Sequence, residues 1–159
     1  MARRKVKEPV EPWIWKEVLV ESIDKFPAGT YGFVYEIVSR ETGKKYIGKK
    51  QLYSYHTKVS KVFNESTKRW NKVREVIATE SNWKDYFGSS VEVKELIKQE
   101  GKQSFERHIL TIARNKKELT YREAQYQMMY SVLEDSRYIN SNILGKPKVL
   151  RYAYRRKIG

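Results

Sequence analysis

The chain has 159 residues, a length typical of one folded domain, and 40% of them are hydrophobic. It contains no cysteine and only two histidines, His56 and His108, which excludes disulfides, thiolate zinc sites and histidine-rich metal sites. Lysine and arginine number 33 against 19 aspartate and glutamate, for a formal charge of +14. This basic, tyrosine-rich composition favours nucleic acid as the partner; a binder of acidic proteins or a merely soluble basic protein is the alternative.

Composition divides the chain into three regions. Residues 1–30 form a basic N-terminal extension that opens with MARRKVKEPVEP and lacks the apolar stretch of a secretory signal. Residues 31–145 are expected to form the folded domain, with a basic insertion at 53–82, and residues 146–159 a basic tail. The chain has no run of 18 or more apolar residues, so we expect no membrane span and a cytoplasmic location.

The first predicted elements form a hairpin. Residues 13–23, WIWKEVLVESI, fit a short helix or a strand. Residues 31–39 are rich in aromatic and β-branched side chains and predict a strand, which a turn at 40–43 joins to a returning strand at 44–52. The insertion at 53–82 is polar and basic, and its pattern is compatible with a partly helical segment.

Two helices and one more strand complete the prediction. A capping box at residues 89–92 predicts a helix that ends at Gly101. Residues 105–113 alternate as a third strand, and residues 120–133 predict a helix whose first and fourth residues form a second capping box. The expected fold is therefore an α+β domain with a small central antiparallel three-stranded sheet flanked by helices.

The predicted hairpin brings two tyrosines together. Its register places Tyr35 opposite Gly48 and diagonal to Tyr46 on one face of the sheet. Diagonal neighbours lie about 7–8 Å apart, so two phenols can converge on one site. Gly48 leaves room for a ligand to approach the backbone, and Lys44 and Lys50 add positive charge to the same face. The alternative is an ordinary hairpin with two core tyrosines, because aromatic residues favour strands anyway.

Two short segments resemble the motifs of the GIY-YIG nuclease superfamily. Tyr46-Ile47-Gly48 matches the second motif letter for letter, and its tyrosine stands eleven positions after Tyr35, a spacing usual in that family. The first motif departs, because Phe33-Val34-Tyr35 stands where Gly-Ile-Tyr is usual and keeps the tyrosine.

The downstream order resembles the homing-endonuclease branch of that superfamily. Ser89-Ser90 precedes the first helix, and Arg122-Glu123-Ala124 opens the second, where the family keeps a metal-binding glutamate. Asn140 stands where the family often has an asparagine. The resemblance covers about residues 31 to 143, and it is specific because the whole order agrees.

The resemblance implies a magnesium-dependent DNA endonuclease that hydrolyses phosphodiester bonds, similar to small phage-encoded, homing-type enzymes of a bacterial or phage-infected cell. Glu123 would hold Mg²⁺ or Mn²⁺, since one carboxylate with water ligands suits such an ion. Tyr35 would act as general base or relay, and Tyr46 would orient the attacking water or the phosphate. Asn140 completes this implied set of catalytic residues.

The family also places an arginine after its second motif, and this chain lacks one there. By spacing, His56 takes that catalytic position; Arg69 or Arg74 reaches the site instead if the insertion begins earlier. A solvated basic surface that contacts the DNA backbone is the alternative for these residues. The other cations expected to contact DNA are Lys44, Lys49, Lys50, Arg155 and Arg156.

Two rival functions stand beside the nuclease. A nucleic-acid-binding protein that retains the fold without activity is favoured by the altered first motif and the missing arginine. A basic structural or ribosome-associated protein would make the second motif a coincidence, and Glu123 would then serve as a helix cap. The presence of both Tyr46 and Glu123 favours a nuclease, acting on DNA as a monomer or homodimer.

Overall fold

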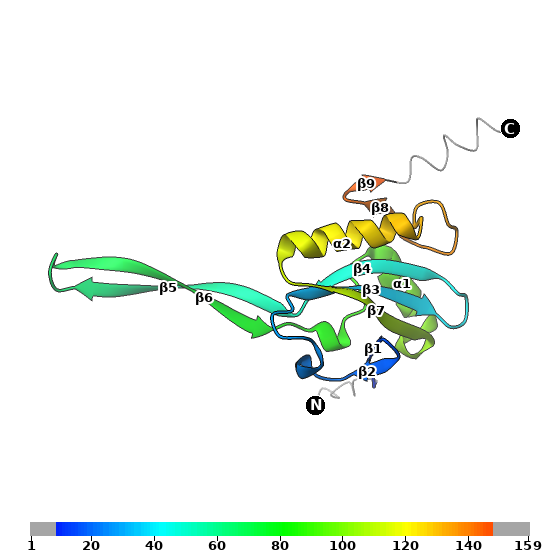
Figure 1. Ribbon diagram of the computed structural model, residues 1–159, viewed down its shortest axis with the longest axis horizontal. Coiled ribbons are helices and arrows are strands. Elements are labelled where there is room, and N and C mark those ends of the chain that lie inside the picture. Colours follow the sequence, from blue (N-terminus) through cyan, green and yellow to red (C-terminus); the bar gives the residue numbers. More distant parts are fainter. Residues whose placement is uncertain (1–8, 148–159) are drawn as a thin grey trace, which may run out of the picture.

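A mixed β-sheet forms the centre of the computed structural model, which describes residues 9–147 (Figure 1). β3 is antiparallel to both β4 and β7, and β1 is parallel to β7. The expected α+β class is confirmed, but the expected three-stranded sheet is wrong, because two more strands extend it to five. In the spatial order β2-β1-β7-β3-β4, the strands span Val18–Val20, Trp13–Trp15, Phe105–Ala113, Gly32–Ser39 and Lys45–Gln51.

The two additional strands, β1 and β2, come from the segment whose sequence fitted a helix or a strand. Lys16 and Glu17 both have positive φ, 49° and 66°, as in a tight two-residue hairpin turn. Trp13 of β1 is fully buried and packs edge-on against Phe33, with ring centroids 5.0 Å apart. Its indole Nε1 donates a hydrogen bond to the carbonyl of Trp83. These long-range contacts, which periodicity does not reveal, favour the strand.

The hairpin of β3 and β4 has the predicted register. Tyr35 pairs with Gly48 and Ile37 with Tyr46, so both tyrosines lie on one sheet face. Their ring centroids are 6.3 Å apart. Because β4 is an edge strand of the sheet, side chains from both sheet faces meet along its outer side.

One helix covers each face of the sheet (Figure 1). Val93 of the first helix packs on the face that carries Tyr35, and Leu119 of the second packs on the face that carries Ile47. The core is therefore divided into two apolar clusters, one on each side of the sheet. The two helices are α1 (Val91–Glu100) and α2 (Lys116–Met129).

The N-terminal cap of helix α1 lies one residue later than predicted. Ser90, not Ser89, has extended backbone angles and accepts a hydrogen bond from the Val93 amide. The helix ends at Gly101, as predicted, where a φ of 82° suits glycine.

Helix α2 begins earlier than predicted, at a different cap. The Asn115 side chain accepts from the Glu118 amide, and the Glu118 carboxylate accepts from the Arg114 amide. The predicted capping box of Thr120 and Glu123 is therefore wrong. Glu123 lies in the middle of α2, so helix capping does not explain its presence.

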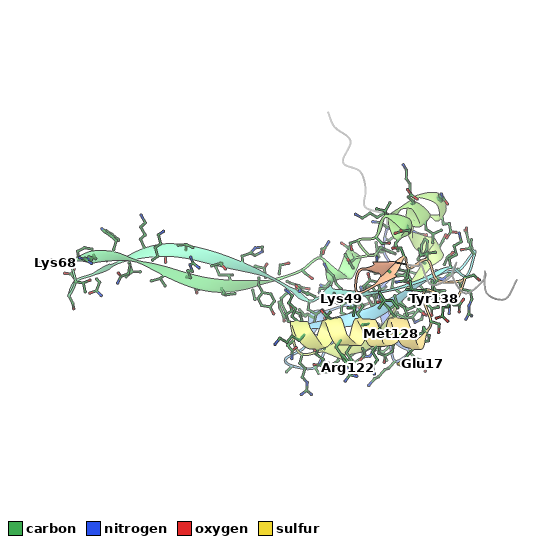
Figure 2. All side chains as sticks on the ribbon, turned by 90° about the horizontal axis from the view of Figure 1, so that it is seen from above. Glu17, Lys49, Lys68, Arg122, Met128 and Tyr138 are labelled. Carbon is green, nitrogen blue, oxygen red and sulfur yellow. The ribbon has the colours of Figure 1, made fainter. Side chains whose placement is uncertain are left out.

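The basic insertion forms a long two-stranded arm, in place of a partly helical segment. Its strands, β5 (Tyr53–Asn64) and β6 (Arg69–Glu80), are antiparallel along their whole length. Figure 1 shows the arm projecting from the sheet, and Figure 2 places Lys68 at its far end. The many valines, threonines and aromatic residues of this stretch account for the strands.

Short elements join the main ones. Single 3-10 turns span Ile23–Lys25, Trp83–Asp85 and Lys102–Ser104, and a small hairpin of β8 (Asn142–Ile143) and β9 (Lys146–Pro147) follows α2. Within residues 9–147, no helix has the length and apolar character needed to cross a membrane.

Candidate active site

A polar pocket opens along the outer side of β4, between the start of α1 and the middle of α2. Its volume is about 270 Å³. Side chains from both sheet faces reach it, because β4 is at the edge of the sheet. The polar residues that line it include Tyr46, Lys49, Ser90, Glu123, Gln127 and Asn140.

Glu123 is the acidic residue of this pocket. Its side chain is 18% exposed, and its Oε1 lies 3.4 Å from Nζ of Lys49. Burial raises the pKa of Glu123, and the neighbouring Lys49 opposes that rise. Lys49 also donates a 3.1 Å hydrogen bond to Oγ1 of Thr120, one helical turn before Glu123. The pair places one negative and one positive group side by side at the pocket.

Tyr46 is the tyrosine that faces the pocket. Burial, followed by the charge of Glu123, raises the pKa of Tyr46 to about 12, and a hydrogen bond with Ser90 acts in the opposite direction. The phenol therefore stays protonated near neutral pH. In that state its hydroxyl can donate a hydrogen bond to an anionic ligand.

Tyr35 lies behind Tyr46 and is 1% exposed. Burial raises its pKa well above the ordinary value for a phenol, and Tyr86 and Tyr46 add to that rise. Its hydroxyl occupies the space beside Gly48 where a side chain would otherwise lie. The room at Gly48 is thus taken by Tyr35 itself, not left open for a ligand.

Asn140 and Gln127 hold the middle of β4 in place. The Asn140 amide accepts from the Ile47 N–H at 3.1 Å and donates to the Ile47 carbonyl at 2.8 Å. Gln127 donates to the same carbonyl at 3.1 Å. Since Ile47 lies between Tyr46 and Gly48, these bonds position the motif strand. Asn140 is 1% exposed, and its amide oxygen and nitrogen both bond to the Ile47 backbone.

Lys50 contacts Asn82 and the ring of Tyr86. Its Nζ donates to Oδ1 of Asn82 at 2.8 Å and lies 4.2 Å from the centre of the Tyr86 ring. Burial lowers the pKa of Lys50. Tyr86 in turn contacts Tyr35, with ring centroids 5.9 Å apart. Lys50 is thus linked to the tyrosine pair without lining the pocket.

The structure does not bring the remaining predicted cations to the pocket. Lys44 is exposed in the turn between β3 and β4. His56 is exposed on β5, and Arg69 and Arg74 are exposed on β6. None of these four lines the pocket. Arg155 and Arg156 lie outside the described residues.

The polar residues of the site that the sequence did not single out include Ser90, Thr120 and Gln127. Two of them carried a signal. Gln127 follows Glu123 by four positions, so the two share one face of α2. Ser90 belongs to the serine pair before α1. The sequence predicts Thr120 as a helix cap, and only its hydrogen bond with Lys49 shows that it belongs to the site.

A hard divalent cation fits the chemistry of this pocket. Among residues 9–147, no cluster of three or more histidine, aspartate and glutamate side chains exists that would enclose a metal. Glu123 supplies one carboxylate in a polar cavity with space for water. Mg²⁺ retains several waters and is commonly bound by one or two carboxylates with substrate phosphates. The residues present therefore suit such an ion and not a soft metal.

Comparison with known proteins agrees with this arrangement. A family described as "Putative endonuclease segE, GIY-YIG domain" matches residues 13–143. No curated protein and no solved structure matches the chain. The matched region includes both added strands, the arm and every polar residue named in the pocket. Because the match spans most of the 159 residues, the chain belongs to the segE-type GIY-YIG endonuclease family.

Proposed function

We propose that the protein is a DNA endonuclease that hydrolyses phosphodiester bonds at the β4 pocket, with a divalent cation held by Glu123. The observation that carries this proposal is the position of Glu123, largely buried beside Lys49 and Tyr46 in a polar cavity. A buried carboxylate with a raised pKa is destabilising for a fold, and such groups concentrate at functional sites. Membership of an endonuclease family supports the reaction class.

Three side chains of the pocket have distinct roles in this proposal. Glu123 would hold the cation, which would supply positive charge at the phosphate and make water a stronger nucleophile. Lys49, beside that carboxylate, contacts a phosphate oxygen through a charge-assisted hydrogen bond. Tyr46 donates its phenolic hydrogen to the phosphate or the attacking water and orients it.

Tyr35 takes a positioning role in preference to that of general base. A base must reach its proton donor, and Tyr35 is 1% exposed. Its raised pKa also makes the phenolate costly to form near neutral pH. Tyr35 instead packs against Tyr46 and Gly48 and sets the shape of the motif strand.

Supercoiled-plasmid nicking tests the proposal directly. We expect cleavage with Mg²⁺ or Mn²⁺ and none with EDTA. Glu123→Gln should lower the rate by about 100-fold or more, a loss typical for one group that stabilises charge in a transition state. Glu95→Gln, an exposed change on α1 with the same loss of charge, is the control. Cleavage that persists in Glu123→Gln would reject the assigned site.

A nucleic-acid-binding protein without nuclease activity is the second candidate. It is favoured by the lack of an arginine among the side chains that line the β4 pocket. DNA binding by the wild-type chain, with no metal-dependent cleavage of plasmid or branched DNA, would support this candidate.

The nuclease proposal also includes a biological setting. Because the order of the motifs resembles the homing branch, we propose a phage-encoded, homing-type enzyme of an infected bacterium.

A further inference from the structure

The arm formed by β5 and β6 is long and exposed on both faces. Each strand has twelve residues, which at about 3.3 Å per residue makes the arm about 40 Å long. All of β6 and most of β5 are exposed. Among the described residues no third strand pairs with it. An isolated two-stranded ribbon is only marginally stable in water, so a surface of this length is expected to serve a partner.

The register divides the cations of the arm unequally between its two faces. Lys61 pairs directly with Lys72, and Arg74 follows two residues later on the same face. On the opposite face Lys58 pairs directly with Glu75, and Arg69 is the second cation of that face. We call the surface of Lys61, Lys72 and Arg74 the basic face.

The pairing of two lysines on the basic face destabilises the free protein. Like charges directly opposite each other in a sheet are destabilising. The one carboxylate on this face, Glu80, lies at the root of the arm and accepts a hydrogen bond from Trp83. No ion pair involves Lys61 or Lys72 within the described part of the chain. A bound anion would turn this unfavourable pairing into a favourable one.

Aromatic side chains lie on the same face toward the tip. Phe63 pairs with Trp70, and their ring centroids are 5.4 Å apart. Trp70 is 66% exposed, which is costly for so large an apolar side chain. Basic side chains beside exposed aromatic rings are typical of surfaces that bind nucleic acid.

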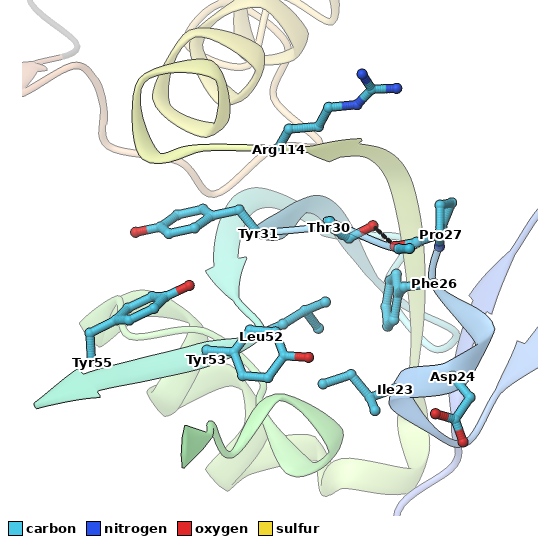
Figure 3. A pocket seen from close by; sticks show the side chains of 12 residues that line it. Ile23, Asp24, Phe26, Pro27, Thr30, Tyr31, Leu52, Tyr53, Tyr55 and Arg114 are labelled. Carbon is cyan, nitrogen blue, oxygen red and sulfur yellow. Dashed lines mark hydrogen bonds between the residues drawn. The ribbon is translucent and has the colours of Figure 1, made fainter. Parts of the chain in front are cut away.

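The root of the arm is fixed to the sheet domain. Tyr55 of β5 stacks on Tyr31, with ring centroids 5.9 Å apart and an angle of 10° between their planes. Gln51 donates to the Tyr31 hydroxyl at 2.6 Å. Figure 3 shows the two rings side by side at the edge of a root pocket of about 620 Å³. These contacts give the arm a set direction relative to the β4 pocket.

We propose that the basic face binds duplex DNA. The two-stranded arm would lie in the major groove, along the duplex beyond the cleaved bond. The major groove accepts a two-stranded β-ribbon, and a length of about 40 Å is close to one turn of the duplex, about 34 Å. Lys61, Lys72 and Arg74 contact phosphates, while Trp70 and Phe63 contact the groove near the tip. This inference rests on the proposed function, because that function makes DNA the substrate.

A pair of matched double variants tests the proposal. Lys61→Ala/Lys72→Ala removes two cations from the basic face, and Lys58→Ala/Lys98→Ala removes one cation from the opposite face of the arm and one exposed cation from α1. Affinity for a 30-base-pair duplex is measured by fluorescence anisotropy over a range of salt concentrations, in EDTA to prevent cleavage. Each lost phosphate contact lowers the salt slope of binding by about 0.9. We therefore expect a slope lower by about 1.8 and at least tenfold weaker binding in the first variant, with little change in the second.

A hydroxyl-radical footprint gives a second readout. Protection should extend about one turn of DNA beyond the cleaved bond in the wild type and retract in Lys61→Ala/Lys72→Ala. Equal binding losses in both double variants, or unchanged binding in both, would overturn the proposal. A third outcome would also overturn it: the wild type sediments as a dimer, the Phe63→Ser/Trp70→Ser variant sediments as a monomer, and this variant keeps the wild-type DNA affinity and footprint. The arm would then be a protein interface.

The two proposals fail separately. If Glu123-dependent cleavage occurs while the double variants bind DNA like the wild type, the arm proposal is wrong and the nuclease stands. If the salt slope falls as expected while no metal-dependent cleavage occurs, the arm binds DNA and the nuclease proposal is wrong.

Discussion

Nζ of Lys49 lies 3.4 Å from Oε1 of Glu123, and both side chains line the pocket between β4 and α2. The two residues come from different elements and meet on the α2 side of the edge strand. Lys49 is the neighbour that opposes the burial-driven rise in the pKa of Glu123. The ion pair therefore keeps the carboxylate available for a cation in a site that disfavours its charge.

Replacement of Lys49 by Met should move the acid limb of the pH–rate profile to higher pH. Without the lysine, burial acts unopposed, so the pKa of Glu123 rises further and the carboxylate protonates at a higher pH. The measurement is metal-dependent nicking from pH 5 to 9. Lys49→Arg keeps the charge and should leave the limb near its wild-type position. An unshifted limb in Lys49→Met would show that another group controls it.

Glu123→Gln should stabilise the fold at neutral pH while it slows cleavage by about 100-fold or more. The folded-state pKa of Glu123 is raised, so its contribution to stability is fully present below the unfolded pKa and is lost as pH rises through the folded pKa. Glutamine carries no charge, and the advantage of the variant should therefore shrink toward pH 4. Thermal unfolding at pH 4 and pH 8 measures this. A lower Tm of the variant at pH 8 would contradict the expectation.

Asn140→Ala should destabilise the protein and disturb catalysis together. It removes both hydrogen bonds to Ile47 and leaves the buried Ile47 N–H without its partner, at a cost of about 2–3 kcal/mol. Urea denaturation measures the change. Asn142→Ala, at an exposed position two residues later, should cost less than about 0.5 kcal/mol. If the two variants unfold at the same urea concentration, Asn140 does not position β4.

Gly48→Ala should destabilise the fold by about 1–3 kcal/mol through overpacking. The new methyl group would overlap the Tyr35 hydroxyl and lie close to the Tyr46 ring. Tyr35→Phe removes that hydroxyl, so the double variant Tyr35→Phe/Gly48→Ala should lose less than the sum of the single losses. Additive losses in a double-mutant cycle would indicate that Gly48 is required for another reason.

Much of the sheet and part of the site followed from local patterns. The turn that ends at Gly43 sets the hairpin register, and this register places Tyr35 opposite Gly48. The helix end at Gly101 and the strand β7 were likewise readable from turn chemistry and alternation. The strands within residues 13–20 could not be predicted in this way. Each has only three residues, too few to show the alternation of a strand, and their formation depends on the burial of Trp13.

The sequence by itself determined the basic charge, the exclusion of thiolate and histidine-rich metal sites, the tyrosine hairpin and the family motifs. Only the tertiary structure decided that Glu123 is no helix cap and that Lys49, not a distant arginine, is its cationic neighbour. Only the fold showed that the basic insertion is an arm that carries His56, Arg69 and Arg74 out of the pocket. The physical reason is that hairpin register and turns depend on neighbours in sequence, whereas the pocket forms where an edge strand meets two helices distant in the chain.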